Sequence, residues 1–280
     1  MKHTVVRLSY SVHDIEPYIN WNYFFYAWSM NGKPEEARQS LRHDAEAMLA
    51  EMDGKYHTHA VFGIFDANSD GDDLLLDGVR IPMLRQQRPA KEGQPCYCLS
   101  DFVRPLSSGI TDKAGAFCTS VESSLTENYM DDPYSQMLSQ TLADRLAEGT
   151  AEKMHEEVRR KYWGYAPDEH LTMEETHAER YQGIRPAIGY PSLPDTSINF
   201  ILDGILDMRS IGVRLTESGM MTPHASVSGF MFSHPKAFYF YLGKIGEDQL
   251  RDYAHRRGLP VEVVRRFLQS SLAADTKVKG

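Results

Sequence analysis

Beyond Pro133, apolar side chains recur at every fourth position along one continuous stretch of the chain. The recurring residues are Leu138, Leu142, Leu146, Thr150, Met154, Val158 and Tyr162. This spacing predicts an amphipathic helix of about 25–28 residues that ends at Gly164. At about 100° per residue, the face opposite the apolar stripe carries Asp144, Glu148, Glu152, His155 and Arg159. We therefore expect Glu148 at the protein surface rather than in the core.

The first half of the chain predicts one long helix and a β-hairpin. Residues 36–53 are rich in helix formers at a helical period and stop before Gly54, a residue typical of helix C-caps. The apolar run 60–65 predicts a buried strand, and residues 74–76 predict its return strand after the acidic turn 66–73. Because that turn lacks the closing glutamate of an EF-hand, we interpret it as a hairpin turn and not as a calcium site. A further strand is predicted over 114–121, and a long polar loop over 84–95.

The second half of the chain combines an irregular segment with further strands and helices. Residues 181–195 contain three prolines and two glycines, which excludes a regular element and predicts an ordered loop. Helices are predicted over 199–209, 246–258 and 260–272, and strands over 213–216, 226–232 and 238–242. The sequence contains no internal repeat and no linker. We therefore expect one domain over residues 1–280.

Charge and cysteine content restrict the partners and the compartment. The net charge is −9 and the pI about 5.7, which argues against a nucleic-acid partner. The basic clusters 159–161 and 256–257 are interpreted as solvated helix ends, with a docking patch as the alternative. The three cysteines suggest neither a disulfide framework nor a zinc site. With no signal-peptide pattern and no apolar run of the ~18 residues that a membrane helix needs, we expect a cytoplasmic protein without a membrane partner.

Several common catalytic and cofactor motifs are missing from the sequence. There is no Gly-x-Gly-x-x-Gly turn after a strand and no Walker lysine loop, which argues against a dinucleotide fold and a P-loop. His155 and Glu156 do not complete a His-Glu-x-x-His zinc motif because Arg159 occupies the second ligand position. His57 and His59 are interpreted as surface histidines. We expect no metal site.

One loop carries a pattern suited to a small zwitterionic ligand. In Arg185-Pro186-Ala187-Ile188-Gly189-Tyr190-Pro191, the prolines stiffen a backbone that can present fixed N–H and C=O groups. The arginine can form two hydrogen bonds to a carboxylate, and the tyrosine offers a planar face and a hydroxyl. The alternative is a structural loop whose arginine caps a helix end.

The same loop, read from Tyr181 to Pro191, resembles the S-adenosylmethionine (AdoMet) signature of the activation domain of cobalamin-dependent methionine synthase. Further segments resemble that family in the same order along the chain. They are residues 21–28, 68–73, 99–103, 142–148, 162–167, 215–218, 227–229, 232–235 and 243–245 with 248–249. The resemblance extends from about residue 15 to residue 272.

The resemblance implies an α+β fold, a single domain with a twisted, mainly antiparallel β-sheet flanked by helices. It implies that AdoMet lies in a shallow groove at the sheet edge. The implied AdoMet contacts are Asn20, Glu148, Arg185, Ala187, Tyr190 and Tyr239. On electrostatic grounds we expect Glu148 to meet the ammonium of the methionyl group and Arg185 to meet its carboxylate. Tyr190 is the candidate catalytic residue, because it is expected to lie between AdoMet and a cobalamin and to act by positioning.

Two positions depart from the family pattern. Asn20 stands where the family usually has an aspartate, and Ile188 stands where the loop usually has another proline. Asn keeps an acceptor oxygen but loses the charge, which we expect to weaken a contact to cationic AdoMet by about 1–2 kcal/mol.

The resemblance implies a methyltransferase-type function in methionine biosynthesis: reductive methylation of inactive cob(II)alamin with AdoMet as the methyl donor. Since the modules for homocysteine, methyltetrahydrofolate and cobalamin are missing from this sequence, we expect action in trans on the cobalamin-binding module of a separate methionine synthase, with little activity alone. A flavodoxin-like protein is the expected electron donor. Two alternatives are a small-ligand-binding module of the same fold with a lost or changed ligand, and a reactivator of another corrinoid methyltransferase.

Overall fold

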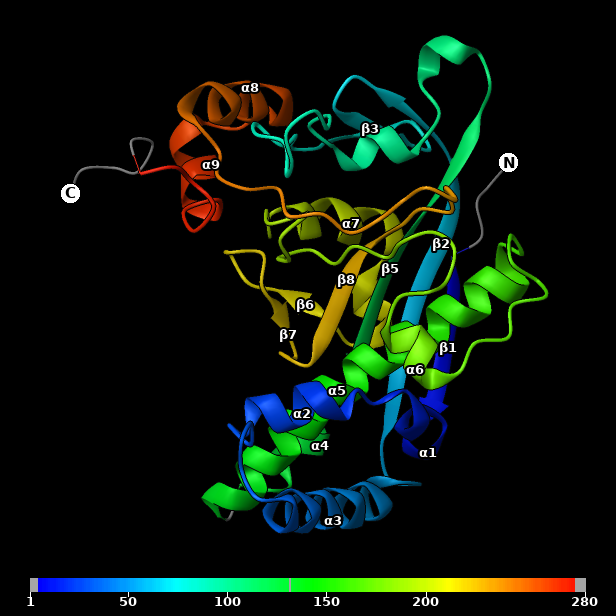
Figure 1. The fold of residues 1–280 in the computed structure, drawn as a ribbon, viewed down its shortest axis with the longest axis vertical. Helices are drawn as coiled ribbons and strands as arrows, with labels where there is room; N and C mark the ends of the chain where they lie inside the picture. Colours follow the sequence, from blue (N-terminus) through cyan, green and yellow to red (C-terminus); the bar gives the residue numbers. More distant parts are fainter. Residues whose placement is uncertain (1–4, 131, 275–280) are drawn as a thin grey trace.

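A six-stranded antiparallel sheet forms the centre of the molecule (Figure 1). The computed structural model describes residues 5–130 and 132–274. The sheet consists of β1 (Val6–Ser11), β2 (His57–Asp70), β3 (Asp73–Leu76), β4 (Val79–Pro82), β5 (Asp112–Val121) and β8 (Ser226–Met231). The strand order is β4-β3-β2-β5-β8, and β1 pairs with the first half of β2. A short second sheet joins β6 (Arg214–Leu215) and β7 (Met221–Thr222).

Helices pack around this sheet and extend the molecule at both ends. They are α1 (Val12–Ile15), α2 (Trp21–Ala27), α3 (Glu35–Met52), α4 (Ser124–Glu127), α5 (Pro133–Glu157), α6 (Met173–His177), α7 (Ile198–Leu206), α8 (Glu247–Arg257) and α9 (Val261–Phe267). Figure 1 shows α3 at one end of the molecule and α8 with α9 at the other. The expected α+β class with a mainly antiparallel sheet and flanking helices is confirmed. Residues 1–4 and 275–280 of the expected domain lie outside the described residues.

The sheet separates two hydrophobic cores. Along β5, Ala114, Ala116 and Cys118 pack into one core, whereas Phe117 and Val121 pack into the other. Because successive side chains point to opposite faces of a strand, a strand covered on both faces is apolar at nearly every position. This explains why residues 114–121 form a continuous apolar run.

Helix α5 has the predicted extent. Asp132 caps its start by accepting the backbone N–H groups of Tyr134 and Ser135, each at 2.9 Å, and Pro133 occupies the first turn. After Glu157 the helix continues as one π turn, Val158–Tyr162. It ends before Gly164, whose φ of +71° lies in the left-handed region.

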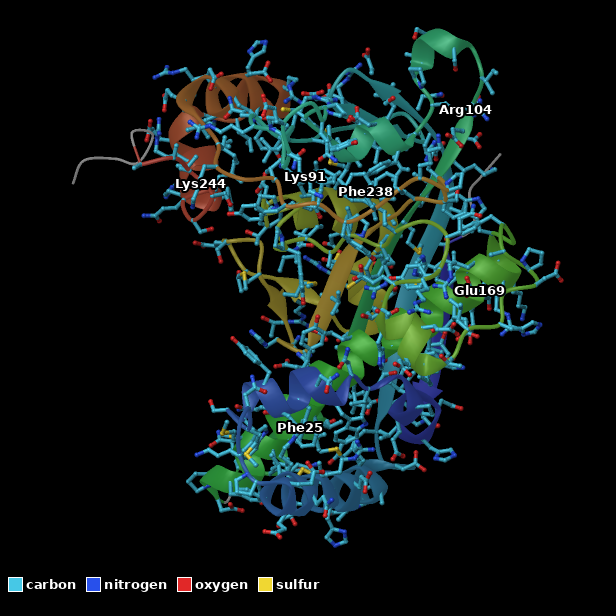
Figure 2. All side chains as sticks on the ribbon, viewed as in Figure 1. Phe25, Lys91, Arg104, Glu169, Phe238 and Lys244 are labelled. Carbon is cyan, nitrogen blue, oxygen red and sulfur yellow. The ribbon has the colours of Figure 1, made fainter. Side chains whose placement is uncertain are left out.

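Two polar side chains of this helix are buried, although the helical period predicted them at the surface. His155 and Arg159 are both 0% exposed. The Arg159 guanidinium pairs with Glu169 (Figure 2) at 2.6 Å and lies 4.3 Å from the ring centre of Tyr181. The prediction was wrong because the chain after the helix folds back over this face, and a periodicity argument on one helix does not include such a segment.

The two basic clusters are largely engaged inside the protein. Besides Arg159, Arg257 forms a buried pair with Asp195 at 2.7 Å, and Arg256 pairs with the buried Asp73 at 2.6 Å. Arg160 and Lys161 are exposed. The interpretation of each cluster as a solvated helix end, or as a docking patch, was therefore wrong for three of the five residues.

The predicted strand 238–242 is an extended segment without a β-ladder. Its polar contacts are with single groups: the Tyr241 carbonyl accepts from the Gln86 side chain at 2.8 Å, and Leu242 donates to the Pro191 carbonyl at 3.1 Å. Its aromatic rings, among them Phe238 (Figure 2), pack against Tyr97 and Phe102. The aromatic residues that predicted a strand therefore pack as rings in the core and do not belong to a sheet. In residues 5–130 and 132–274, no helix is long and apolar enough to cross a membrane.

Candidate functional site

A cavity of about 690 Å³ opens beside helix α5. It lies between α2, α5, the loop 185–192 and the extended segment 239–241. The lining residues include Tyr23, Tyr26, Arg145, Glu148, Glu152, Glu179, Tyr181, Arg185, Ala187, Tyr190, Tyr239 and Tyr241. This volume is typical of pockets for small molecules and cofactors.

Helix α5 contributes a charged stripe to the cavity. Arg145, Glu148 and Glu152 follow at intervals of three and four residues, which places them on one face of the helix. Arg145 pairs with Glu148 at 2.7 Å, and the Tyr190 hydroxyl donates to Glu148 at 3.2 Å. Burial raises the pKa of Glu148, while the Arg145 guanidinium opposes the shift. Glu148 is thus half-buried at the cavity wall, where the sequence predicted an exposed position.

The loop with the arginine and tyrosine is fixed to the edge strand β8. Ile188 N–H donates to the Ser228 carbonyl at 2.8 Å, and Phe230 N–H donates to the Pro186 carbonyl at 3.1 Å. In this antiparallel arrangement, the N–H and C=O of the intervening Ala187 point away from β8. The Ala187 carbonyl accepts the Tyr190 N–H at 3.3 Å, whereas Ala187 lines the cavity and can present its backbone N–H to a ligand.

Gly229 on β8 permits this close contact. A Cβ at this position would overlap the carbonyl oxygen of Pro186 and lie 3.0 Å from both the Ala187 Cα and the Phe117 ring. Only a residue without a side chain allows the loop backbone to approach so closely.

Arg185 lies at the base of the cavity in an ion pair with Glu152. The two side chains are 10% and 20% exposed, and the guanidinium nitrogen and carboxylate oxygen are 2.6 Å apart. Burial is the largest single influence and opposes the charge of the guanidinium, but Glu152 together with Tyr239 and Tyr181 raises the pKa of Arg185. The backbone N–H of Arg185 donates to the Tyr239 hydroxyl at 2.8 Å, and this hydroxyl lies 3.2 Å from that of Tyr181. Tyr239 therefore anchors the loop while its ring lines the cavity.

Glu179 adds a third carboxylate to the cavity. It forms no ion pair with any residue in the described part of the chain, whereas Glu148 and Glu152 each have an arginine. Burial and the Glu152 charge raise its pKa. Its φ of +57° is unfavourable for a residue with a side chain. Three carboxylates against two arginines leave the cavity with one excess negative charge, which favours a cationic ligand.

Exposed tyrosines surround the cavity. Tyr23, Tyr26, Tyr190 and Tyr241 line it and are 60%, 70%, 51% and 64% exposed. Burial and the Glu148 charge raise the pKa of Tyr190 to about 12, so its hydroxyl keeps its proton at neutral pH. Aromatic groups that stay in water on an unliganded surface are typical of binding sites.

Five of the six predicted site residues meet in this cavity: Glu148, Arg185, Ala187, Tyr190 and Tyr239. Asn20 is not among the described residues that line it. Its side chain instead caps α2 by accepting the Asn22 N–H at 3.1 Å. The predictions missed Arg145, Glu152 and Glu179 as cavity residues. The spacing of Arg145 and Glu152 from Glu148, one turn in each direction, is the signal that could have found the first two.

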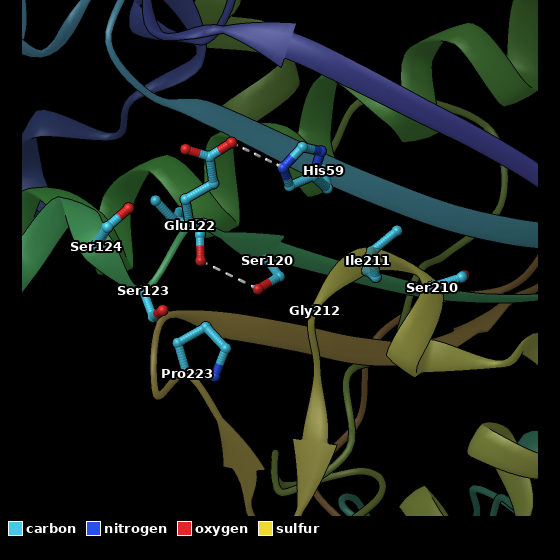
Figure 3. Close-up of a pocket in the computed structure, with 10 residues that line it drawn as sticks. His59, Ser120, Glu122, Ser123, Ser124, Ser210, Ile211, Gly212 and Pro223 are labelled. Carbon is cyan, nitrogen blue, oxygen red and sulfur yellow. Dashed lines mark hydrogen bonds and ion pairs between the residues drawn. The ribbon is translucent and has the colours of Figure 1, made fainter.

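A second cavity of about 380 Å³ lies between β5 and the 210–212 turn (Figure 3). Two pairs of polar groups lie within its lining: His59 lies 3.3 Å from Glu122, and Ser120 donates to the Val121 carbonyl at 3.3 Å. None of the predicted site residues lines it. His59 is half-buried and its neighbour His57 is exposed. Arg145, Glu152 and Arg185 in the larger cavity each have a buried polar atom without a hydrogen-bond partner among the described residues, whereas no residue that lines the smaller cavity does. The larger cavity is therefore the candidate site.

Comparison with known proteins identifies the family of the chain. A family model for the activation domain of vitamin B12 dependent methionine synthase matches residues 11–258. A crystal structure of the MetH reactivation domain bound to AdoHcy superimposes with a TM-score of 0.91 at 39% sequence identity. The alignment covers 97% of this chain and 91% of that one.

Proposed function

The chain belongs to the activation-domain family of vitamin B12 dependent methionine synthases, and from this premise we propose that it binds AdoMet in the cavity beside α5 and presents its methyl group to a cobalamin. One observation carries the proposal: five residues expected to contact AdoMet converge on a cavity with an excess negative charge. AdoMet carries a sulfonium, an ammonium and a carboxylate. Such a ligand complements a wall that contains both carboxylates and arginines.

The charged groups suggest how the methionyl part lies. Arg185 meets the carboxylate through guanidinium N–H groups that Glu152 leaves free. Glu148 and the unpaired Glu179 face the ammonium and the sulfonium. The backbone N–H of Ala187 donates to a polar edge of the nucleoside. We also keep Asn20 as a proposed AdoMet contact, because it caps α2 and the α2 residues Tyr23 and Tyr26 line the cavity.

The cobalamin is the methyl acceptor and is carried by the partner. A low-potential donor, which we propose to be a flavodoxin-like protein, supplies one electron to cob(II)alamin. The electron pair on the reduced cobalt then forms the cobalt–carbon bond, the sulfur–carbon bond breaks with its pair on sulfur, and AdoHcy is released. No side chain of this chain need act as acid, base or nucleophile. Tyr190, half exposed at the mouth, contributes by positioning the two reactants.

We extend the proposal to action in trans on the cobalamin-binding module of a separate methionine synthase, in the cytoplasm, with the chain acting as one domain. Free thiols at all three cysteines suit a reducing compartment. A reactivation assay with the cobalamin module supplied as a separate chain tests the trans reaction. The alternative, a module of the same fold with a changed ligand, is favoured by Asn20 and its position outside the cavity lining.

Isothermal calorimetry with AdoMet tests the binding step. We expect wild-type protein to bind and Arg185→Ala to abolish binding. Arg251→Ala is the matched control, because Arg251 is 67% exposed on α8 and outside the cavity. A wild-type titration without heat at high micromolar AdoMet would refute the proposal. Unchanged AdoMet affinity in Arg185→Ala would show that Arg185 does not contact the ligand.

A further inference from the structure

We infer that Glu152 is a positioning residue for ligand recognition: it holds the Arg185 guanidinium at the base of the cavity so that its remaining N–H groups meet the ligand carboxylate. The inference rests on the proposed function, because it presumes that the ligand of this cavity is AdoMet. It adds a residue that the sequence predicted only as part of an exposed helix face.

The ion pair uses only part of each group. One oxygen of Glu152 contacts one terminal nitrogen of Arg185 at 2.6 Å. The other carboxylate oxygen of Glu152 and the Nε of Arg185 are buried and have no hydrogen-bond partner among the described residues. Buried polar atoms normally have partners. The ion pair therefore leaves one donor of Arg185 and one acceptor of Glu152 without a partner, and polar atoms of a ligand, or water, can complete their pairing.

The surroundings explain why Arg185 needs a fixed counter-ion. Its guanidinium is 10% exposed and lies 5.4 Å from the ring centre of Phe117. A guanidinium in such an apolar setting is unfavourable without a paired charge. Without the carboxylate of Glu152, the flexible side chain would turn toward water. Ligand binding would then have to order it again, which lowers affinity.

Glu152 is itself held rigidly. It lies on the long helix α5, one turn after Glu148, while the backbone N–H of Arg185 is fixed by the Tyr239 hydroxyl. Both ends of the Arg185 side chain are therefore fixed: the backbone by Tyr239 and the guanidinium by Glu152. A donor held at both ends before binding recognises a carboxylate without further ordering.

The test compares AdoMet with decarboxylated AdoMet, which keeps the sulfonium and the ammonium but lacks the carboxylate. Calorimetry on wild-type protein should show tighter binding of AdoMet. In Glu152→Gln, we expect AdoMet affinity to fall about tenfold or more. The affinity for decarboxylated AdoMet, which loses only the attraction of one cavity carboxylate, should fall clearly less. Glu152→Asp, which keeps the charge but shortens the side chain, should give an intermediate loss with AdoMet. The control Glu156→Gln alters the next turn of α5, where the carboxylate pairs with Arg160 outside the cavity, and should change neither affinity.

The alternatives give opposite results. If Glu152 acted only as a negative charge that attracts a cation, Glu152→Gln would weaken decarboxylated AdoMet at least as much as AdoMet. If it competed with the ligand for Arg185, AdoMet affinity would rise. Either result would overturn the inference, and so would a ratio of the two affinities that is the same in Glu152→Gln as in the wild-type protein. In each of these cases, AdoMet binding by the wild-type protein would still support the proposed function. Absence of AdoMet binding in the wild-type protein would refute the proposed function and the inference with it.

Discussion

Replacement of Gly229 by alanine should separate the loop 185–192 from β8. The added Cβ would overlap the carbonyl oxygen of Pro186 and approach Ala187 Cα and the Phe117 ring to 3.0 Å. Two of the three neighbours are backbone atoms, and the third belongs to a ring that is 0% exposed. None of them can move aside cheaply, so the loop must shift as a unit.

The cost follows from the contacts that this shift breaks. The hydrogen bonds Ile188 N–H to Ser228 O and Phe230 N–H to Pro186 O, at 2.8 and 3.1 Å, contribute about 1 kcal/mol each. Overpacking against the buried ring adds about 1–3 kcal/mol. We therefore expect Gly229→Ala to lower the free energy of unfolding by roughly 3–5 kcal/mol. A protein of ordinary stability stays mostly folded after such a loss, so ligand binding remains measurable.

Urea unfolding followed by circular dichroism measures the stability change, and calorimetry measures AdoMet affinity. Gly204→Ala is the matched control, because Gly204 lies within α7 and an added Cβ there meets nothing within 4 Å. Alanine should stabilise that helix by about 0.5–1 kcal/mol. A Gly229→Ala protein with wild-type unfolding midpoint and wild-type AdoMet affinity would refute the claim that close contact with β8 holds the loop.

Three further changes test the buried ion pair, the unpaired carboxylate and the departure from the family pattern. Arg159→Leu should cost about 3–5 kcal/mol in urea unfolding, because it leaves the Glu169 carboxylate buried without a counter-ion; a loss below about 1 kcal/mol would contradict this. Glu179→Gln should weaken AdoMet binding at neutral pH yet stabilise the ligand-free protein. The pKa of Glu179 is raised by folding, so the folded protein keeps this proton to a higher pH than the unfolded chain does. Above the pKa of the unfolded chain, ionisation of Glu179 therefore lowers the stability of the folded protein, and glutamine removes this cost. Unfolding at about pH 4 and about pH 7 checks the sign, since the gain in stability should be larger at the higher pH. Asn20→Asp should raise AdoMet affinity about tenfold by adding a charge, and a change below twofold would remove Asn20 from the ligand contacts.

The sequence predicted those helices and strands whose own apolar periodicity reflects the face that they bury. The helix of residues 35–52, the hairpin of β2 and β3, strand β5 and the long helix α5 all have a clear apolar period and a recognisable end. Strand β1 was missed, although it is paired along its whole length with β2. It is short and alternates only weakly, and its stability comes from a partner some fifty positions away in the chain. Such long-range pairing leaves little local signal.

The same distinction separates the site residues that were predicted from those that were missed. Arg185, Ala187 and Tyr190 lie within one continuous loop, so a local motif was enough to find them. Glu152 and Glu179 become cavity residues only through the fold: Glu152 because the loop places Arg185 against α5, and Glu179 because it follows α6 at the cavity mouth. Residues whose role depends on a distant partner cannot be recognised from periodicity alone.

His155 and Arg159 extend this argument to the electrostatics of the site. Both were predicted at the surface, yet both are buried behind the cavity, against the ring of Tyr181. Burial and the nearby Arg159 and Arg185 lower the pKa of His155, so the imidazole stays neutral and adds no positive charge next to Arg185. A charged imidazole there would cancel the excess negative charge that favours a cationic ligand. His155 and Arg159, which the sequence predicted to be exposed, therefore help to set the net charge of the cavity. Because His155 is neutral and Arg159 is paired with Glu169, the carboxylates that line the cavity determine the charge of the ligand that can bind.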